Sequence, residues 1–352
     1  VVRKMETKKR ITGIAELQFI CCCLIVLRHS DPLNGLGIQE IALTGTADLF
    51  IYKLIDFITH MTEVAVPIFF FISGFLYFND FNSLNDYAAK VKKRLSSIVV
   101  PYFIWSFLNW LYFAVITHIP AISTRMNMKP VRLDSRNMIQ DIVMSNYAPL
   151  WFLRVLFCLC ILGIVLNWVL NYKGVALVVI SMLILWNAFG GYGYQSITAW
   201  TPFFIGGGYL RKYGSKFVIE HEKIILFVAS ILLIISYVLD EGTTGSVLYI
   251  ARFLTAAALF SIFSRKETTE KWFWGASMFI YCTHFSIVSA IEKLMFLALG
   301  KNIVVGLVAY ITVPILIIFT LSYLARFINI KIPNVWRVIV GNRSLMIKDE
   351  KK

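Results

Sequence analysis

The stretch Pro67-Ile68-Phe69-Phe70-Phe71-Ile72-Ser73-Gly74-Phe75 places a small polar Ser-Gly step inside an otherwise apolar segment. A helix needs about 20 apolar residues to cross the roughly 30 Å hydrocarbon layer of a membrane. This stretch belongs to such an apolar run, at residues 58–78. The segment therefore predicts a membrane helix in which a small hydroxyl and a missing side chain have a role, either in close helix packing or in a site.

The composition of the whole chain also predicts a membrane protein. Of the 352 residues, 58% are hydrophobic and only 15% are charged, which excludes an ordinary soluble domain. We expect an all-α membrane protein with about ten transmembrane helices in one bundle, and the sixth is the weakest because it is short and contains Pro202. The predicted spans are 13–31, 58–78, 97–118, 149–170, 174–190, 197–211, 223–240, 246–264, 274–298 and 303–327.

Basic residues predict how this bundle is oriented, because positively charged short loops stay on the cytoplasmic side. With ten spans, the basic N-terminal tract, the loop after span two and the later even-to-odd loops fall on one side. We therefore expect a cytoplasmic tail at 1–12, a membrane domain at 13–330 and a second cytoplasmic tail at 331–352. The stretch from Ile119 to Ala148 is assigned to the outside despite four basic residues, Arg125, Lys129, Arg132 and Arg136.

The net charge of +14 does not indicate a nucleic-acid partner, because the basic residues flank spans and do not form one stripe with interleaved aromatics. The six cysteines predict neither a disulfide nor a metal site, because all fall inside predicted spans without a CxxC pair. They are Cys21, Cys22, Cys23, Cys158, Cys160 and Cys282. The first span lacks a small-residue cleavage site, so we expect it in the mature protein.

Ionisable residues at membrane depth are candidates for a functional site, because a charge in lipid is costly. Helical rise of ~1.5 Å per residue places six of them, from five spans, between the midplane and the outer face. They are His29, His60, Glu63, Arg154, Arg252 and His284. We expect them to share a polar cavity that opens to the exterior. The simpler alternative is that the arginines, Arg28 included, reach external headgroups, and that each histidine bonds a neighbour.

Seven segments, in order along essentially the whole chain, resemble the acyltransferase 3 family of integral-membrane acyltransferases, which includes bacterial O-acetyltransferases of surface glycans. The first combines Arg10 to Ile14 with Leu17, Ile20 and His29, and the second is Val66 to Phe75. The others are Lys93-Arg94 to Pro101-Tyr102 with Trp105, Leu150 to Leu153, Phe203 to Gly206, Ser277 to His284, and Gly341 to Arg343.

One position departs from the family pattern. The family usually carries an arginine or lysine eleven residues before the first-helix histidine, and Gln18 stands there in this chain; an acidic residue common near Ala15 is also missing. Eleven residues make about three helical turns, so Gln18 and His29 share a face with ~16 Å between them. Because glutamine can only hydrogen-bond, donor binding is expected to be weaker, to rely on another cation, or to be lost.

The resemblance implies a membrane O-acyltransferase, most simply an O-acetyltransferase. It would move an acyl group from cytoplasmic acyl-CoA to a hydroxyl of a surface glycan or glycolipid at the outer face of the bacterial cytoplasmic (inner) membrane. His29 would act as a general base or as a transient acyl carrier. Arg154 and Arg252 would stabilise the developing oxyanion, and His284 would line the site or be a buried histidine satisfied by its neighbours.

Further residues are expected along the path of the substrates. The acyl path would include Gln18, Ser73, Gly74, Trp151, Tyr281 and Glu63. The donor phosphates would be held by Arg10, Lys92, Lys93 and Arg94. These cations also suit a plainer role as topology and headgroup anchors, and Ser73 with Gly74 also suits helix packing.

We expect no permanently bound cofactor and no metal, with acetyl-CoA or another acyl-CoA as co-substrate. The expected partners are this donor, the glycan or glycolipid acceptor and membrane lipids, and a homo-oligomer is compatible with the sequence. The alternative function is a transporter or flippase that moves a glycan intermediate or small acid without acyl chemistry. The lack of an inverted repeat disfavours that alternative.

Overall fold

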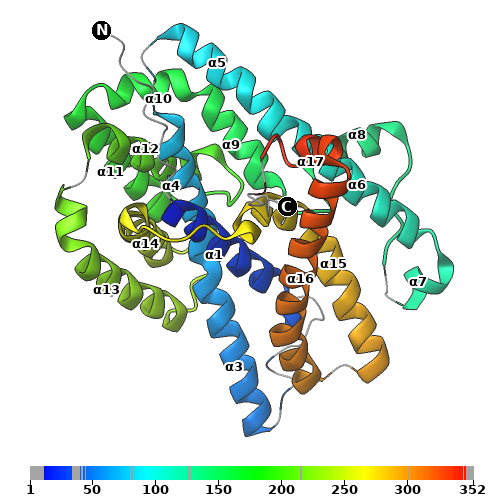
Figure 1. Ribbon diagram of the computed structural model, residues 1–352. Helices are drawn as coiled ribbons and strands as arrows, with labels where there is room; N and C mark the ends of the chain where they lie inside the picture. Colours follow the sequence, from blue (N-terminus) through cyan, green and yellow to red (C-terminus); the bar gives the residue numbers. More distant parts are fainter. Residues whose placement is uncertain are drawn as a thin grey trace.

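The computed structural model describes residues 12–33, 40, 43, 45–79, 81, 83–125, 128–214, 216–300, 302–343 and 345. Arg10 and most of the predicted N-terminal tail lie outside this range. Every regular element among the described residues is helical. Figure 1 shows α1 in the middle of the molecule, with α11 to α14 gathered on one side and α15 and α16 on the other.

The longer helices are α1 (Thr12–His29), α3 (Thr46–Met61), α4 (Ala65–Tyr77), α5 (Leu84–Arg94), α6 (Val100–Thr117), α9 (Trp151–Ile161), α11 (Lys173–Gly190), α12 (Ile197–Tyr213), α13 (Lys216–Val238), α14 (Ser246–Arg265), α15 (Ser277–Leu299) and α16 (Ile303–Lys331). The shorter ones are α7 (Pro120–Arg125), α8 (Ser135–Met144), α10 (Gly163–Leu170) and α17 (Pro333–Ile339). Three irregular helical segments join them: η2 (Thr62–Val64), η3 (Leu95–Val99, a π-helix) and η4 (Trp272–Ala276).

Seven of the described helical segments are long and apolar enough to cross a membrane, and the bent pair α9 and α10 would make eight. Each of the ten predicted spans coincides with a helix or a helix pair, so a multi-pass helical membrane protein is confirmed. The helices of the sixth and seventh spans, α12 and α13, are not among the seven. The count of ten, and with it the cytoplasmic placement of both ends, therefore stays a prediction.

Close backbone contact between α4 and α12 explains one half of the Ser-Gly step. A Cβ atom at Gly74 would collide with the carbonyl of Phe204, and a Cβ atom at Gly207 would collide with the carbonyl of Phe71. Small residues allow two helices to approach this closely at membrane depth. Gly74 therefore serves the packing of α4 on α12, whereas its neighbour Ser73 faces a cavity described below.

The stretch from Ile119 to Ala148, predicted as an external loop, folds back along α6. The Val131 amide donates to Thr117 Oγ1 over 3.1 Å, and Trp110 on α6 belongs to the same small apolar cluster as Val131 and, on α8, Met138. Near the start of α6, the Tyr102 hydroxyl donates to the carbonyl of Val143 over 2.6 Å. The stretch thus forms part of the helical packing, and its side of the membrane stays a prediction.

Candidate active site

Two histidines lie at the contact between α1 and α15. His29 is the last residue of α1, and its ring centroid is 5.3 Å from that of His284, with an angle of 41° between the planes. The ring of the neighbouring Phe285 lies edge-on to His29, also at 5.3 Å. The structure therefore brings together two of the predicted catalytic residues.

The hydrogen bonds of His284 fix which of its ring nitrogens carries the proton. Its Nδ1 lies 3.1 Å from the carbonyl oxygen of Ile280 and 2.9 Å from that of Tyr281, and carbonyls can only accept. Nδ1 therefore donates, and in the neutral ring Nε2 keeps its lone pair. Nε2 is buried and has no hydrogen-bond partner among the residues that the structure describes. This buried lone pair, beside His29, is a free proton acceptor.

A buried carboxylate, Glu63, lies near the end of α1 that carries His29. It projects from η2, the short 3-10 segment between α3 and α4, and is 3% exposed. Its Oε1 forms an ion pair with Arg28, the residue before His29, and its Oε2 lies 2.5 Å from Nη2 of Arg252, which is fully buried. The carboxylate thus joins α1 to α14 through two cations, and it fixes the residue next to His29.

Two tyrosines from the loop after α11 complete this ionic cluster. The Tyr194 hydroxyl donates to Glu63 Oε2 over 3.3 Å, and Nη1 of Arg252 donates to the Tyr192 hydroxyl over 2.7 Å and to the carbonyl of Thr243 over 2.7 Å. Burial, reinforced by the Glu63 carboxylate, raises the pKa of Tyr194. Its hydroxyl therefore stays protonated at neutral pH and remains a donor to Glu63.

Arg154, the other arginine predicted to act in catalysis, lies apart from the ionic cluster. Its Nη1 donates to the carbonyl of Met144 over 3.2 Å, and its Nη2 donates to Oε1 of Gln195 over 3.0 Å. The guanidinium thus ties α9 to the end of α8 and to the loop that carries the two tyrosines. His60 also lies outside the histidine pair: its Nε2 is 2.8 Å from the hydroxyl of Ser236 on α13.

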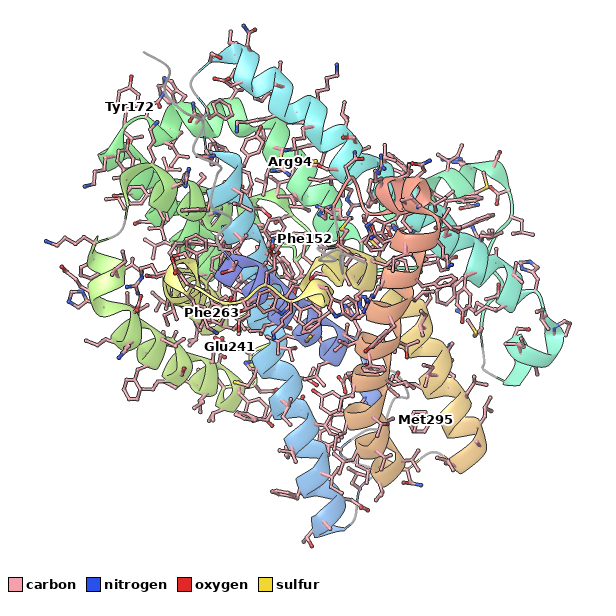
Figure 2. The ribbon with its side chains drawn as sticks, viewed as in Figure 1. Arg94, Phe152, Tyr172, Glu241, Phe263 and Met295 are labelled. Atoms are coloured by element: carbon pink, nitrogen blue, oxygen red, sulfur yellow. The ribbon has the colours of Figure 1, made fainter. Side chains whose placement is uncertain are left out.

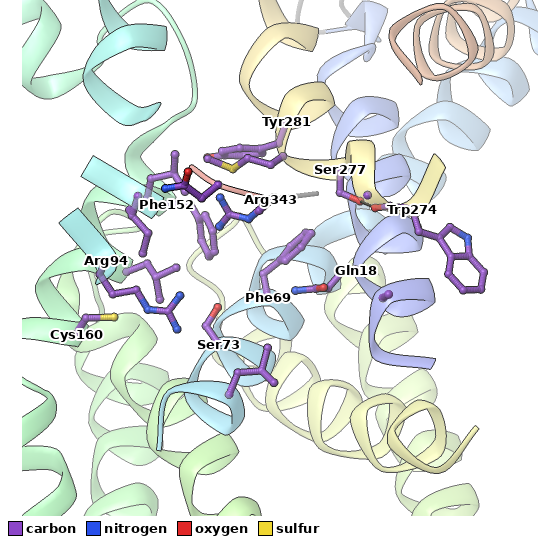
Figure 3. A pocket seen from close by; sticks show the side chains of 18 residues that line it. Gln18, Phe69, Ser73, Arg94, Phe152, Cys160, Trp274, Ser277, Tyr281 and Arg343 are labelled. Atoms are coloured by element: carbon purple, nitrogen blue, oxygen red, sulfur yellow. Dashed lines mark hydrogen bonds between the residues drawn. The ribbon is translucent and has the colours of Figure 1, made fainter. Parts of the chain in front are cut away.

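A cavity of about 430 Å³ lies between α1, α4, η3, α9, the start of α15 and the segment after α17. Figure 2 places Phe152, one of its wall residues, near the middle of the molecule, with Arg94 above it toward α5. Figure 3 shows the polar side chains that surround the space. They include Gln18, Ser73, Arg94, Ser277, Tyr281 and Arg343. Four of these were predicted for the acyl path or the donor phosphates.

Tyr281 connects this cavity to the histidine pair. It lines the cavity wall, and its ring centroid is 6.2 Å from that of His284, one turn further along the same face of α15. Its hydroxyl donates to the carbonyl of Pro149 over 2.6 Å, which holds the ring between cavity and histidines. The cavity therefore has Arg94 and Tyr281 in its wall, and the ring of Tyr281 separates it from the imidazoles.

The remaining predicted residues do not line the cavity. Lys92 and Lys93 are exposed on α5. Trp151 begins α9 and packs its ring 5.1 Å from that of Tyr194 and 5.6 Å from that of Trp200, so it borders the Glu63 cluster. Gly74 faces α12, as described above.

The sequence did not single out three residues of this region. Tyr192 and Tyr194 occupy a loop between spans, where tyrosine is common as an interfacial anchor, so nothing in the sequence indicates a bond to a buried ion pair. Arg343 belongs to the last segment that resembles the family. Because it is far from α1 in the sequence, no local pattern indicated that it lies in the same cavity wall. The only signal was its position in that segment.

A family model described as an acyltransferase domain matches residues 13–326. No curated protein and no solved structure matches the chain. The matched region contains both histidines, the Glu63 cluster and most of the cavity wall, but it ends before Asn342 and Arg343.

Proposed function

The chain belongs to the acyltransferase 3 family, and from that premise we propose that this membrane acyltransferase moves an acyl group, most simply acetyl, from an acyl-CoA thioester to a hydroxyl of a surface glycan or glycolipid. One observation carries the proposal: a cavity with guanidinium groups in its wall is lined by Tyr281, whose ring lies beside that of His284, and the ring of His284 lies beside that of His29. A phosphorylated thioester has its charge at one end and its reactive carbon at the other, which suits such an arrangement.

In this proposal the donor lies along the cavity with its phosphates toward Arg94 and its acyl group toward Tyr281. The wall between them offers the hydroxyl of Ser73, the amide of Gln18 and the ring of Phe152. An acyl-pantetheine arm carries both amide groups and apolar carbons, so this mixed lining suits it. Gln18 here offers a hydrogen bond where the family usually has a cation.

The proposed chemical step is attack of the acceptor hydroxyl oxygen on the thioester carbonyl carbon. His29 takes the hydroxyl proton as general base, a C–O bond forms, and the C–S bond breaks. The leaving coenzyme A thiolate then takes a proton, so the reaction needs no other reactant. His284, whose Nε2 has no partner among the described residues and whose ring lies beside His29, stabilises the proton held by His29 during the step.

The ionic cluster positions His29 in this proposal. Arg252 has both terminal nitrogens engaged with Glu63, Tyr192 and the Thr243 carbonyl, so its charge is directed at the carboxylate. Glu63 in turn holds Arg28 and thereby the end of α1. Preorganised groups of this kind are worth most in a site that excludes water. We therefore assign Arg252 to positioning and leave the oxyanion role to Arg154 as a prediction from the resemblance.

The test is an assay for ester formation. The purified protein in lipid vesicles is given acetyl-CoA labelled in the acetyl group, together with extracted surface glycan or glycolipid. We expect alkali-labile label on the acceptor, because a carbohydrate ester is cleaved by base. Transport of the glycan or a small acid across the vesicle membrane without any ester would favour the alternative function.

A further inference from the structure

The segment that follows α16 is fixed against η3 at the cavity. The Trp105 indole donates to the carbonyl of Ile339 over 2.8 Å, and the Trp336 indole donates to the carbonyl of Arg343 over 3.0 Å. Gly341 has a φ of +67°, and a Cβ atom there would collide with the backbone of Ser97. The turn at Gly341 therefore brings the chain directly onto η3, with the next two residues in the cavity wall.

Arg343 reaches into this cavity from its anchored backbone. Its Nη1 donates to the carbonyl of Ser97 over 2.9 Å and to that of Val340 over 2.7 Å. No hydrogen bond engages its Nη2 or Nε among the described residues, so two donor groups remain. Figure 3 shows the guanidinium between Phe152, Phe69 and Arg94. The side chain is thus held by one nitrogen and offers the others to the cavity.

Arg94 contributes a second guanidinium to the same wall. It extends from the end of α5, and its guanidinium carbon lies 5.8 Å from the centroid of the Tyr77 ring. Among the described residues, neither Arg94 nor Arg343 forms an ion pair with a carboxylate. By contrast, Arg28 and Arg252 are both paired with Glu63.

The two guanidiniums act on each other. Burial, followed by the nearby charge of Arg94, lowers the pKa of Arg343 to about 10, so the side chain stays charged at neutral pH. Two like charges in a partly enclosed space repel, and an anion between them removes that repulsion. The carbonyl of Ser97 in η3 accepts from Arg343, and its buried hydroxyl has no hydrogen-bond partner among the described residues. The two guanidiniums, neither of which is paired with a carboxylate among the described residues, thus line one cavity.

We infer that Arg343 and Arg94 form a binding site for a phosphate or diphosphate group, and that the segment after α16 completes the donor cavity. Guanidinium groups bind phosphate through two parallel hydrogen bonds, which matches the unengaged nitrogens of Arg343. The inference rests on the proposed function, in which the phosphates belong to acyl-CoA. It adds Arg343, which lies outside the matched region 13–326, to the donor site. Its charge would replace that of the cation that the family usually has at the position of Gln18.

The test compares donors with and without phosphates. Coenzyme A binding to the full chain is measured in vesicles of phosphatidylcholine alone, and we expect Arg343→Ala and Arg94→Ala each to weaken it at least tenfold. Arg337→Ala, an exposed arginine of α17, should leave binding unchanged. S-acetylpantetheine lacks the phosphates, so its kcat/KM as acyl donor should be the same in Arg343→Ala as in the unmodified protein.

Two further variants separate this site from folding and from catalysis. Arg343→Lys keeps a charge and should bind coenzyme A better than Arg343→Ala. If Arg343 were purely structural, Arg343→Ala would instead lose the same factor in kcat/KM with acetyl-CoA and with S-acetylpantetheine. His29→Ala should bind coenzyme A normally even though it transfers nothing, so a failed transfer reaction does not decide the binding result. Unchanged coenzyme A affinity in Arg343→Ala would overturn the inference. The inference would also be overturned if the site bound lipid headgroups instead. In that case phosphatidylglycerol added to the vesicles would occupy the site, and coenzyme A would not displace it.

Discussion

The ring centroid of His29 lies 5.3 Å from that of His284, because α1 and α15, which are far apart in the sequence, pack against each other. The ring of His284 is fixed by two backbone carbonyls, and in the described part of the chain its Nε2 has no hydrogen-bond partner. A buried polar atom without a partner costs free energy, and a catalytic role is one reason for which proteins retain such an atom. This geometry supports the proposed role of the pair in proton transfer.

Replacement of His284 tests this reading of the pair. In His284→Ala the proton held by His29 loses its acceptor, so we expect kcat to fall by about 10²-fold or more, within the range of general acid–base contributions. The KM for acyl-CoA should change little, because His284 does not line the cavity. Steady-state rates of acyl transfer give both values, and a raised KM at unchanged kcat would assign His284 to donor binding instead.

Loss of the carboxylate at Glu63 should destabilise the protein. Glu63→Gln leaves the fully buried Arg252 and the half-buried Arg28 without a counter-ion, and such a broken pair costs about 3–5 kcal/mol. Denaturant unfolding in detergent measures the change. The matched control is Lys53→Ala, which breaks the exposed pair with Glu40 and should cost less than about 1 kcal/mol. Equal effects of the two variants would show that the buried cluster contributes no special stability.

The close contact of α4 and α12 predicts that Gly74 tolerates no side chain. Gly74→Ala places a methyl group against the Phe204 carbonyl, so we expect a loss of about 1–3 kcal/mol in unfolding free energy. Gly174→Ala, on α11, meets no atom within 4 Å and should be neutral or slightly stabilising. If both glycines accept alanine equally, the packing role of the Ser-Gly step is wrong.

The cavity also predicts a gain from a cation at position 18. Gln18→Arg adds a guanidinium to a wall that already holds Arg94 and Arg343, so we expect the KM for acyl-CoA to fall by about tenfold, which corresponds to about 1.4 kcal/mol. The effect should shrink as salt is added, because screening weakens exposed charge interactions. A KM that does not respond, or that rises, would place the donor phosphates away from Gln18.

Periodicity and composition predicted the helices well, because each apolar run in this chain must be about as long as the membrane is thick. The sequence also showed that the Ser73-Gly74 step has a role inside an apolar helix. It did not show that Gly74 packs on α12 while Ser73 faces a cavity, because the role of each residue depends on the partner helix. The ion pairs of Glu63 were equally hidden. Their partners, Arg28 and Arg252, lie on α1 and α14, and no local pattern links them.

From the sequence, helical rise placed six ionisable groups at similar membrane depths, and we predicted that they share one cavity. The structure brings His29 and His284 together, and places Glu63 and Arg252 in a separate cluster linked to α1 through Arg28. Depth along a helix follows from residue number, whereas the direction in which a side chain points around the bundle does not. That is why the cavity instead contains Arg94, Gln18 and Arg343, which depth alone did not connect to the histidines.

The most direct test of the histidine centre is the initial rate of acyl transfer from labelled acetyl-CoA by His29→Ala and His118→Ala, measured side by side in lipid. His118 is an exposed histidine that bonds the carbonyl of Ala114 and is remote in sequence from both members of the pair. We predict that His29→Ala loses at least about 10²-fold in rate while its coenzyme A binding persists, and that His118→Ala keeps the full rate. A His29→Ala protein that transfers acetyl as fast as the unmodified protein would contradict the account.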